Sequence, residues 1–235
     1  MSETFLVTGA GRGIGLALTS VLLSQGDHVF AACRNPQSAL ELDTLKKKYA
    51  SNLEILALDV DSDSSVEKAA KEFSKKSPSL DVLMNIAGIS PPPFDAGLEK
   101  LDFEKCRQAF ETNCIGPLRV ARAFLPFLRK SKNARVLNMT SGLASLAGKN
   151  APGFYAYGTS KAALNMLTRT LAFEFQKEGL VFVVMDPGWV RTDMGGPNAT
   201  LAPEESATAI AKTVKGLTMK QTSLFLYNNG NEIAW

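Results

Sequence analysis

Two tyrosines and a lysine lie within the short stretch YAYGTSK, residues 155–161. A helix turns by about 100° per residue, so Tyr157 and Lys161 share one helical face, whereas Tyr155 lies on roughly the other side if it is helical at all. A nearby ammonium favours the phenolate and lowers the pKa of a tyrosine from its ordinary value of about 10. The spacing therefore predicts that Tyr157 transfers protons under the influence of Lys161. The alternative is a packed ring beside a surface cation.

A cluster of glycines occurs near the start of the chain, in FLVTGAGRGIGLAL, residues 5–18. The stretch has the pattern of strand, loop and helix, and its glycines are Gly9, Gly11, Gly13 and Gly15. It is neither the plain GxGxxG pattern nor a P-loop, because no Gly-Lys-Ser/Thr follows. Glycines still let backbone amides approach an anion, and a helix N-terminus favours negative charge. The loop therefore predicts a phosphate site, with a turn that needs glycine only for its backbone as the alternative.

The end of the second predicted strand indicates which dinucleotide binds. In dinucleotide-binding folds a carboxylate here binds the ribose 2′-hydroxyl, whereas an arginine accepts a 2′-phosphate. This strand ends in VFAACRNP, with Arg34 in the stretch that selects the cofactor and no acidic residue before Glu41. Arg12 in the glycine loop offers a second cation. The sequence thus predicts NADP(H) rather than NAD(H), unless Arg34 is only a solvated surface residue.

Short apolar runs alternate with longer helical patterns along the whole chain. The predicted strands are 5–8, 29–33, 53–58, 82–85, 136–139, 181–185 and 223–226. The predicted helices are 13–25, 36–48, 62–75, 102–129, 157–177 and 203–216. Continuously apolar strands are typical of a sheet covered on both faces, and the alternation indicates parallel strands with right-handed crossovers. We expect a single doubly wound (Rossmann) α/β domain over residues 1–235, with a seven-stranded, mostly parallel sheet and helices on both faces.

Composition excludes several other classes of protein. The formal net charge of +3, from 26 basic and 23 acidic residues, is too small for a nucleic-acid partner. No apolar run reaches about 18 residues and the N-terminus lacks an export-signal pattern, so no membrane association is expected. Cys33, Cys106 and Cys114 show no paired spacing, which favours free thiols and a cytoplasmic location. The only histidine, His28, starts a predicted strand away from any ligand cluster, so no metal is expected.

The order and spacing of these motifs resemble the short-chain dehydrogenase/reductase family over nearly the whole chain. One departure is Ile86, where the family usually carries a second asparagine. The residues that carry the resemblance are TGAGRGIG (8–15), Asp59-Val60, NIAG (85–88), Asn113, Ser141, Tyr157-x-x-x-Lys161 and PGWVRTDM (187–194).

The resemblance implies roles for the catalytic residues. Tyr157 would protonate a substrate carbonyl oxygen as hydride arrives from the nicotinamide, and Lys161 would tune Tyr157 and bind the nicotinamide ribose. Ser141 would hold the carbonyl oxygen with a second hydrogen bond. Asn113 would help hold a proton-relaying water, at a helix bent near Pro117. Ser141 as a turn residue and Asn113 as a hydrogen bonder at the bend remain alternatives.

The resemblance also implies further cofactor contacts, most of them made by the backbone. Ile14 would lie on the pyrophosphate, Asp59 and Val60 at the adenine, and the turn at the nicotinamide would follow the sixth strand. The remaining contacts would come from Asn85, Ala87 and Gly88 at the adenosine ribose, and from Pro187, Gly188, Val190 and Thr192 at the nicotinamide.

Within the family, the chain is similar to the short C-factor and sniffer-type carbonyl reductases. PGWVRTDMGGPNA (187–199), Arg34 and the final LYNNGNEIAW (226–235) carry this similarity. It implies an NADPH-dependent reductase of a small-molecule carbonyl, and the family's habit of pairing implies a possible homodimer or homotetramer through helices 102–129 and 157–177.

The substrate pocket is expected from the stretches 90–98, 142–155 and 187–201. Their apolar side chains favour an apolar or aromatic ketone, aldehyde or quinone. The candidate pocket residues are Pro91, Pro92, Pro93, Phe94, Leu143, Leu146, Phe154, Trp189 and Met194. Two rival readings are an NADP(H)-binding sensor without significant turnover and an epimerase or dehydratase of the same fold.

Overall fold

The computed structural model describes residues 2–93 and 97–235. Within them, seven strands form one sheet in the order β3-β2-β1-β4-β5-β6-β7, and every pair of neighbouring strands is parallel. The expected doubly wound α/β fold is confirmed. Its strand order reverses between β1 and β4, and such sheets bind ligands at the carboxyl ends of the strands beside the reversal. The strands are β1 (Thr4–Thr8), β2 (His28–Cys33), β3 (Leu53–Ala57), β4 (Val82–Asn85), β5 (Arg135–Met139), β6 (Val181–Asp186) and β7 (Phe225–Tyr227).

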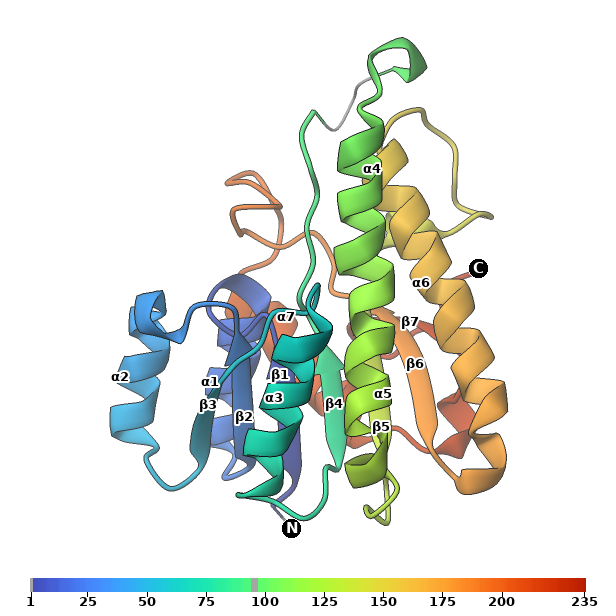
Figure 1. Cartoon of the computed structure of the whole chain (residues 1–235). Coiled ribbons are helices and arrows are strands. Elements are labelled where there is room, and N and C mark those ends of the chain that lie inside the picture. The colour runs from blue at the N-terminus through green and yellow to red at the C-terminus, as the bar shows by residue number, and fades with distance from the viewer. Residues whose placement is uncertain (1, 94–96) are drawn as a thin grey trace.

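Helices cover both faces of this sheet. They are α1 (Gly13–Ser24), α2 (Leu40–Lys48), α3 (Asp63–Ser74), α4 (Phe103–Phe110), α5 (Gly116–Leu128), α6 (Tyr155–Glu174) and α7 (Pro203–Lys215). One core packs α1, α2 and α7 on one face, and a second packs α3, α5 and α6 on the other (Figure 1). The inner strands are buried along their length, as their continuous apolar runs predicted.

The structure divides the helix that was expected over residues 102–129. A π-helical segment, Glu111–Ile115, joins α4 to α5, and the Gly116 amide donates to the Glu111 carbonyl. Pro117 follows in the first turn of α5, where its missing N–H is tolerated. The π segment directly precedes Pro117, and such segments are frequent at functional sites. The bend expected near Pro117 stays a prediction.

The stretches 102–129 and 157–177, through which pairing of subunits is expected, contain four phenylalanines that could serve an interface or the core: Phe110, Phe124, Phe173 and Phe175. Phe124 and Phe175 are buried in the core of the chain, so they do not serve such an interface. Phe110 and Phe173 remain exposed on α4 and α6. The homodimer or homotetramer stays a prediction.

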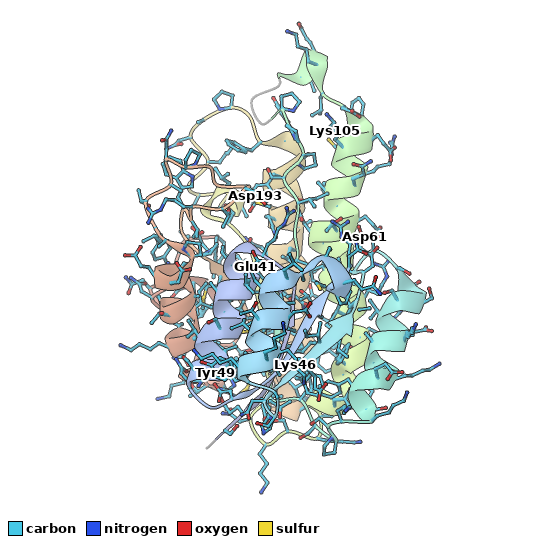
Figure 2. The ribbon with its side chains drawn as sticks, turned by 90° about the vertical axis from the view of Figure 1, so that its left-hand side faces the viewer. Glu41, Lys46, Tyr49, Asp61, Lys105 and Asp193 are labelled. Atoms are coloured by element: carbon cyan, nitrogen blue, oxygen red, sulfur yellow. The ribbon has the colours of Figure 1, made fainter. Side chains whose placement is uncertain are left out.

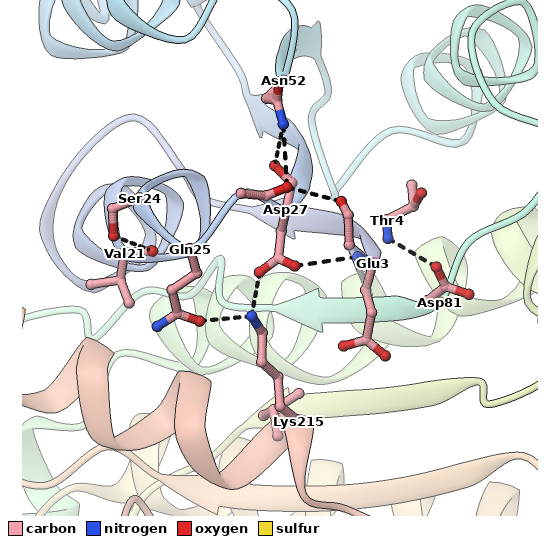
Figure 3. Close-up of polar contacts among 12 residues, drawn as sticks. Glu3, Thr4, Val21, Ser24, Gln25, Asp27, Asn52, Asp81 and Lys215 are labelled. Carbon is pink, nitrogen blue, oxygen red and sulfur yellow. Dashed lines mark hydrogen bonds and ion pairs between the residues drawn. The ribbon is translucent and has the colours of Figure 1, made fainter.

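An ionic network closes the amino ends of the strands, opposite the ligand-binding edge (Figure 3). Lys215 of α7 lies 2.5 Å from the buried Asp27 carboxylate and donates to the Gln25 side chain at 2.7 Å. The Asp81 carboxylate accepts from the Thr4 amide at 2.9 Å. These contacts connect β1, β2, β4 and α7, and they leave the carboxyl ends of the strands to form the site.

Candidate active site

A groove of about 760 Å³ opens at the carboxyl ends of the strands. Its walls come from the loops that follow β1, β2, β3, β4 and β6, together with α6. This volume lies in the range of small-molecule sites. Most of the predicted cofactor residues line it: Gly9, Gly11, Arg12, Gly13, Ile14, Gly15, Arg34, Asp59, Val60, Ala87, Gly88, Tyr157, Lys161, Pro187 and Thr192.

Two glycines of the loop lie so close to other backbone that a side chain is excluded there. A Cβ atom on Gly9 would lie 2.8 Å from Cα of Ala87, and one on Gly15 would lie 2.3 Å from the carbonyl oxygen of Gly9. Gly9 and Gly13 also have positive φ angles, 69° and 55°, which glycine adopts without strain. Helix α1 then starts with no side chain capping its first amides and no acidic residue in its first turn. This helix end therefore suits a diphosphate.

Gly15→Ala should destabilise the protein, because its Cβ atom would meet backbone that cannot move aside. We expect the free energy of unfolding to fall by about 1–3 kcal/mol, the usual cost of overpacking. Gly216→Ala is the matched control, since Gly216 has φ −88° and only ordinary contacts. Urea unfolding of both variants measures the difference. Equal stability of the two variants would contradict the close approach.

Two arginines line the groove at the end predicted to hold a 2′-phosphate. Arg34 is exposed, and Arg12 pairs with Asp193, with 2.9 Å between Nη1 and Oδ2 and both side chains 79% exposed. Figure 2 labels Asp193, which lies in the loop after β6. An exposed pair contributes only about 0–1 kcal/mol, so Arg12 can exchange this carboxylate for another anion at small cost. Sequence reasoning missed this contact because its partners are 181 positions apart.

The three cysteines are free thiols. Burial raises the pKa of both Cys33 and Cys114. At Cys33 a backbone hydrogen bond from Asn35 acts in the lowering direction, and at Cys114 the charge of Lys161 does so. Cys33 and Cys114 are buried, and Cys106 is partly exposed.

Helix α6 carries both tyrosines of the sequence motif. It begins at Tyr155, directly after Phe154 in the left-handed conformation (φ 57°, ψ 33°), so both tyrosines are helical. Tyr155 is 38% exposed. Tyr157 lines the groove, and Nζ of Lys161 lies 5.8 Å from the centroid of its ring. The four-residue spacing therefore brings Tyr157, rather than Tyr155, to Lys161.

Lys161 is buried at the base of the groove. It is 4% exposed, and its Nζ donates a 2.7 Å hydrogen bond to the carbonyl of Met139 at the end of β5. Burial lowers the pKa of Lys161 to about 8, and the electrostatic interaction with Cys114 acts in the raising direction. The lysine is thus held in a fixed position and loses its charge more easily than a lysine in water.

The pKa of Tyr157 differs from the expectation drawn from the sequence. Burial raises the pKa of Tyr157 to about 12, a hydrogen bond with Ser141 acts in the lowering direction, and the charge of Asp186 acts in the raising direction. This net direction is opposite to the lowering expected from Lys161, because the cost of burying a phenolate is the largest effect. Tyr157 is therefore a protonated phenol at neutral pH.

Ser141 lies between β5 and a short 3-10 turn, Gly142–Ala144. Its hydroxyl accepts from the Leu143 amide at 3.2 Å and also hydrogen-bonds Tyr157. Ser141 is thus both a turn residue and a partner of Tyr157. A second hydroxyl nearby, Thr140 Oγ1, donates instead to Asn165 Oδ1 at 2.7 Å, which leaves Ser141 as the serine or threonine at the tyrosine.

Asn113 lies in the π segment and is fully buried. Its Oδ1 accepts from the Ile89 amide at 2.8 Å, and its Nδ2 donates to the Ile89 carbonyl and to Ser160 Oγ at 2.8 and 3.0 Å. Ser160 in turn donates to the Tyr157 carbonyl at 2.8 Å. The side chain therefore connects the loop after β4 to α6. This agrees with the alternative of a structural hydrogen bonder, and the water-holding role stays a prediction.

Three predicted cofactor residues do not line the groove. Asn85 is buried beneath it and donates to Asn138 Oδ1 at 2.8 Å. Gly188 takes a positive φ of 83° in the turn after β6, and Val190 is buried and forms a β-bridge with Leu201. The individual contacts of all predicted residues with a dinucleotide remain predictions.

Sequence reasoning also missed part of the groove wall. Asp61, labelled in Figure 2, lies beside Asp59 at the end of the groove predicted to hold the adenine, and accepts from Thr112 Oγ1 at 2.8 Å. The signal that could have found these missed residues was their position in the sequence, since they lie at or just beyond the end of a predicted strand or in the helix that follows it. The others not singled out are Asn35, Ser38, Ala39, Leu58, Ile89, Met139 and Pro203.

A second, smaller pocket borders the groove at Tyr157. It is lined by Pro91, Pro92, Pro93 and Phe154, as predicted for the substrate side. Phe94 lies outside the described residues. Leu146 is largely exposed and lines neither cavity. Leu143 and Trp189 are exposed and also line neither cavity, whereas Met194 lines the groove.

Two negative observations apply to residues 2–93 and 97–235. None of the helices described there is both long and apolar enough to span a membrane. Those residues also contain no group of three or more histidine, cysteine, aspartate or glutamate side chains that could hold a metal ion.

Comparison with known proteins defines the family. The family described as short chain dehydrogenase matches residues 3–201. The C-signal protein of Myxococcus xanthus is 41% identical over 156 residues, which cover 66% of this chain and 93% of that protein. Two solved structures are 34% identical and cover 100% of this chain: carbonyl reductase Sniffer of D. melanogaster (TM-score 0.95, 100% of that chain) and the NADPH-bound carbonyl reductase from chicken fatty liver (TM-score 0.93, 99% of that chain).

The chain therefore belongs to the short-chain dehydrogenase family and is an oxidoreductase of this family. Carbonyl reductases are among its structural relatives, which agrees with the resemblance read from the sequence.

Proposed function

We propose that this protein is an NADPH-dependent carbonyl reductase whose whole chain forms one catalytic domain. The observation that carries the proposal is the position of Tyr157, a protonated phenol that borders both the groove and the smaller pocket. A dinucleotide in the groove and a carbonyl compound in the pocket would meet at this hydroxyl. Buried Lys161 and hydrogen-bonded Ser141 complete the arrangement.

Tyr157, Ser141 and Lys161 each have a separate role in carbonyl reduction. When bound, the reduced nicotinamide supplies the hydride that reaches the carbonyl carbon. Tyr157 donates its phenolic proton to the carbonyl oxygen, so hydride and proton together convert the carbonyl to an alcohol. Ser141 donates a hydrogen bond to the same oxygen and stabilises its developing charge. Lys161 holds the nicotinamide ribose and, while protonated, stabilises the phenolate that Tyr157 becomes.

The proposal of NADP(H) rests on the charges at the adenosine end of the groove. Arg34 and Arg12 offer two guanidinium groups there, and guanidinium groups bind phosphate through charge-assisted hydrogen bonds. The nearby carboxylate of Asp61 is held by Thr112. Two relatives of known structure are described as bound to NADPH or NADP, and they support the same cofactor.

The lining of the smaller pocket supports an apolar or aromatic carbonyl substrate. Proline rings and Phe154 provide flat apolar surface next to Tyr157, while the lysines at positions 100 and 105 lie on the same pocket wall. Lys105 donates to the Pro92 carbonyl at 2.7 Å, so its ammonium group already has a hydrogen-bond partner within the protein. We therefore expect ketones, aldehydes or quinones with apolar substituents to be preferred.

Steady-state oxidation of NADPH and NADH with a panel of carbonyls tests this proposal. We expect apolar and aromatic carbonyls to be reduced with kcat/KM at least about tenfold above that of small charged keto acids, the effect of roughly 1.4 kcal/mol of transition-state binding. Preference for charged keto acids would overturn the substrate class. Tight NADPH binding without turnover of any carbonyl would favour the rival, an NADP(H)-binding sensor.

A further inference from the structure

A carboxylate at the end of β6 lies behind the proposed active site and has no part in the roles given above. Asp186 Oδ1 accepts a hydrogen bond from the Gly188 amide at 2.9 Å, and the Gly142 amide also hydrogen-bonds this carboxylate. Gly142 approaches closely, since a Cβ atom there would lie 3.0 Å from Asp186 Oδ2. One side chain therefore holds the turn after β5 and the turn after β6.

These two turns carry the groups around the reacting carbonyl. Ser141 directly precedes Gly142, has extended backbone (φ −156°, ψ 150°) and hydrogen-bonds Tyr157. Pro187 and Gly188 form the turn that borders the groove after β6. The position of Ser141 relative to Tyr157 consequently depends on the carboxylate of Asp186.

The charge of Asp186 is not neutralised by a cation. Among the residues that the structure describes, no lysine or arginine forms an ion pair with it. Burial raises the pKa of this carboxyl, and hydrogen bonds from the Gly188 and Gly142 amides oppose that effect by favouring the ionised form. When ionised, Asp186 acts on the pKa of the neighbouring Tyr157 phenol in the raising direction, and no ion pair among the described residues offsets its charge.

The other titratable groups at this place come from each packed element. Helix α6 supplies Tyr157 and Lys161, and the π segment supplies Cys114, which interacts with Lys161. Strand β7 supplies Tyr227, which pairs in register with Asp186. Only Lys161 is cationic among these groups, and burial opposes its charge.

We propose that Asp186 is a positioning residue that fixes Ser141 against Tyr157 and extends the pH range in which Tyr157 stays a proton donor, so that carbonyl reduction persists to higher pH than it would without this carboxylate. The effect of Asp186 on carbonyl reduction rests on the proposed function. Its effect on the pKa of Tyr157 concerns only groups of this chain and can be measured without turnover.

The sign of the effect follows from the charges. A negative charge disfavours a nearby phenolate and raises the pKa of the phenol. Reduction requires the phenol and is lost as pH rises through this pKa, whereas oxidation requires the phenolate and appears as pH rises. Removing the charge of Asp186 should therefore move both pH dependences to lower pH.

The experiment compares the wild type with Asp186→Asn, which keeps the shape of the side chain but loses its charge. The first readout is NMR titration of ring-labelled tyrosines, with the Tyr157 resonance assigned by its absence from Tyr157→Phe. The second readout is the pH profile of kcat/KM for carbonyl reduction and for oxidation of the product alcohol. Asp43→Asn, on the exposed face of α2, removes the same charge far from the site.

In Asp186→Asn we expect ionisation of Tyr157 and both pH profiles to shift down by about one pH unit, the order expected when one partly buried charge is removed. Asp43→Asn should shift neither. Asp186→Glu, which restores the charge, should bring the pH profiles back towards those of the wild type even if the rate stays reduced.

A uniform loss of rate with unchanged titration of Tyr157 would mean that Asp186 only shapes the turns, and would overturn the proposal. If the wild type turns over no carbonyl, the proposed function is refuted. The NMR titration of Tyr157 would still decide whether Asp186 raises its pKa. Should Asp186→Asn not fold, Asp186→Ser removes the charge with a smaller side chain, and the same titration shift is expected.

Discussion

Tyr157→Phe is expected to lower kcat for carbonyl reduction by about 10²–10⁴-fold, the usual contribution of a positioned proton donor. The substitution removes only the hydroxyl, and the ring keeps its place between the groove and the smaller pocket. The loss follows because hydride transfer would otherwise leave an unprotonated alkoxide. Steady-state kinetics with saturating NADPH measure it.

Tyr155→Phe provides the matched control for this prediction. Tyr155 lies on the same helix two positions earlier and is 38% exposed, so loss of its hydroxyl should change kcat by less than about threefold. Affinity for NADPH, measured by cofactor fluorescence, should stay within a similar factor in both variants. Retained activity in Tyr157→Phe, or an equal loss in Tyr155→Phe, would refute the assignment of the proton donor.

Arg34→Ala is expected to weaken NADPH binding by about ten- to 150-fold, because one charge-assisted hydrogen bond contributes roughly 1.5–3 kcal/mol. NADH lacks the 2′-phosphate, so its affinity should change little. Fluorescence titration with both cofactors measures the two dissociation constants. The difference in NADPH affinity between the wild type and Arg34→Ala should shrink at high salt, because Arg34 is exposed and salt screens its charge.

Arg122→Ala controls for the loss of a positive charge. Arg122 is an exposed residue of α5 whose only described ion pair is a loose one to Asp63, with 3.8 Å between the atoms. Replacing Arg122 should leave the affinities for NADPH and for NADH unchanged. Equal weakening of NADPH and NADH in Arg34→Ala would show that Arg34 does not read the 2′-phosphate, and Arg12, released from Asp193, would become the main candidate.

Much of the fold was predictable because its signals are local. Continuous apolar runs such as 181–185 mark strands covered on both faces, and their alternation with helices fixes a parallel sheet. The boundaries of β7 were less predictable: residues 223–226 were expected and Phe225–Tyr227 observed. Ser223 has a positive φ of 67°, a turn conformation that apolar patterning does not encode.

The sequence by itself determined which residue types reach the site. Helical periodicity places Tyr157 and Lys161 on one face, and these two residues are four positions apart, so their relation can be read along the chain. The four glycines of the first loop are a local signal for a tight turn, and at Gly9 and Gly15 a Cβ atom would indeed meet backbone.

Only the tertiary structure decided the electrostatics of that site. The pKa of Tyr157 rises to about 12 through burial and the charge of Asp186, although the adjacent lysine suggested the opposite direction. Arg12 meets Asp193 across 181 positions, and Asn113 lies in a π segment that no sequence pattern indicated. Burial and long-range charge depend on which strands and loops meet at the edge of the sheet, and the three-dimensional packing of the whole chain sets them.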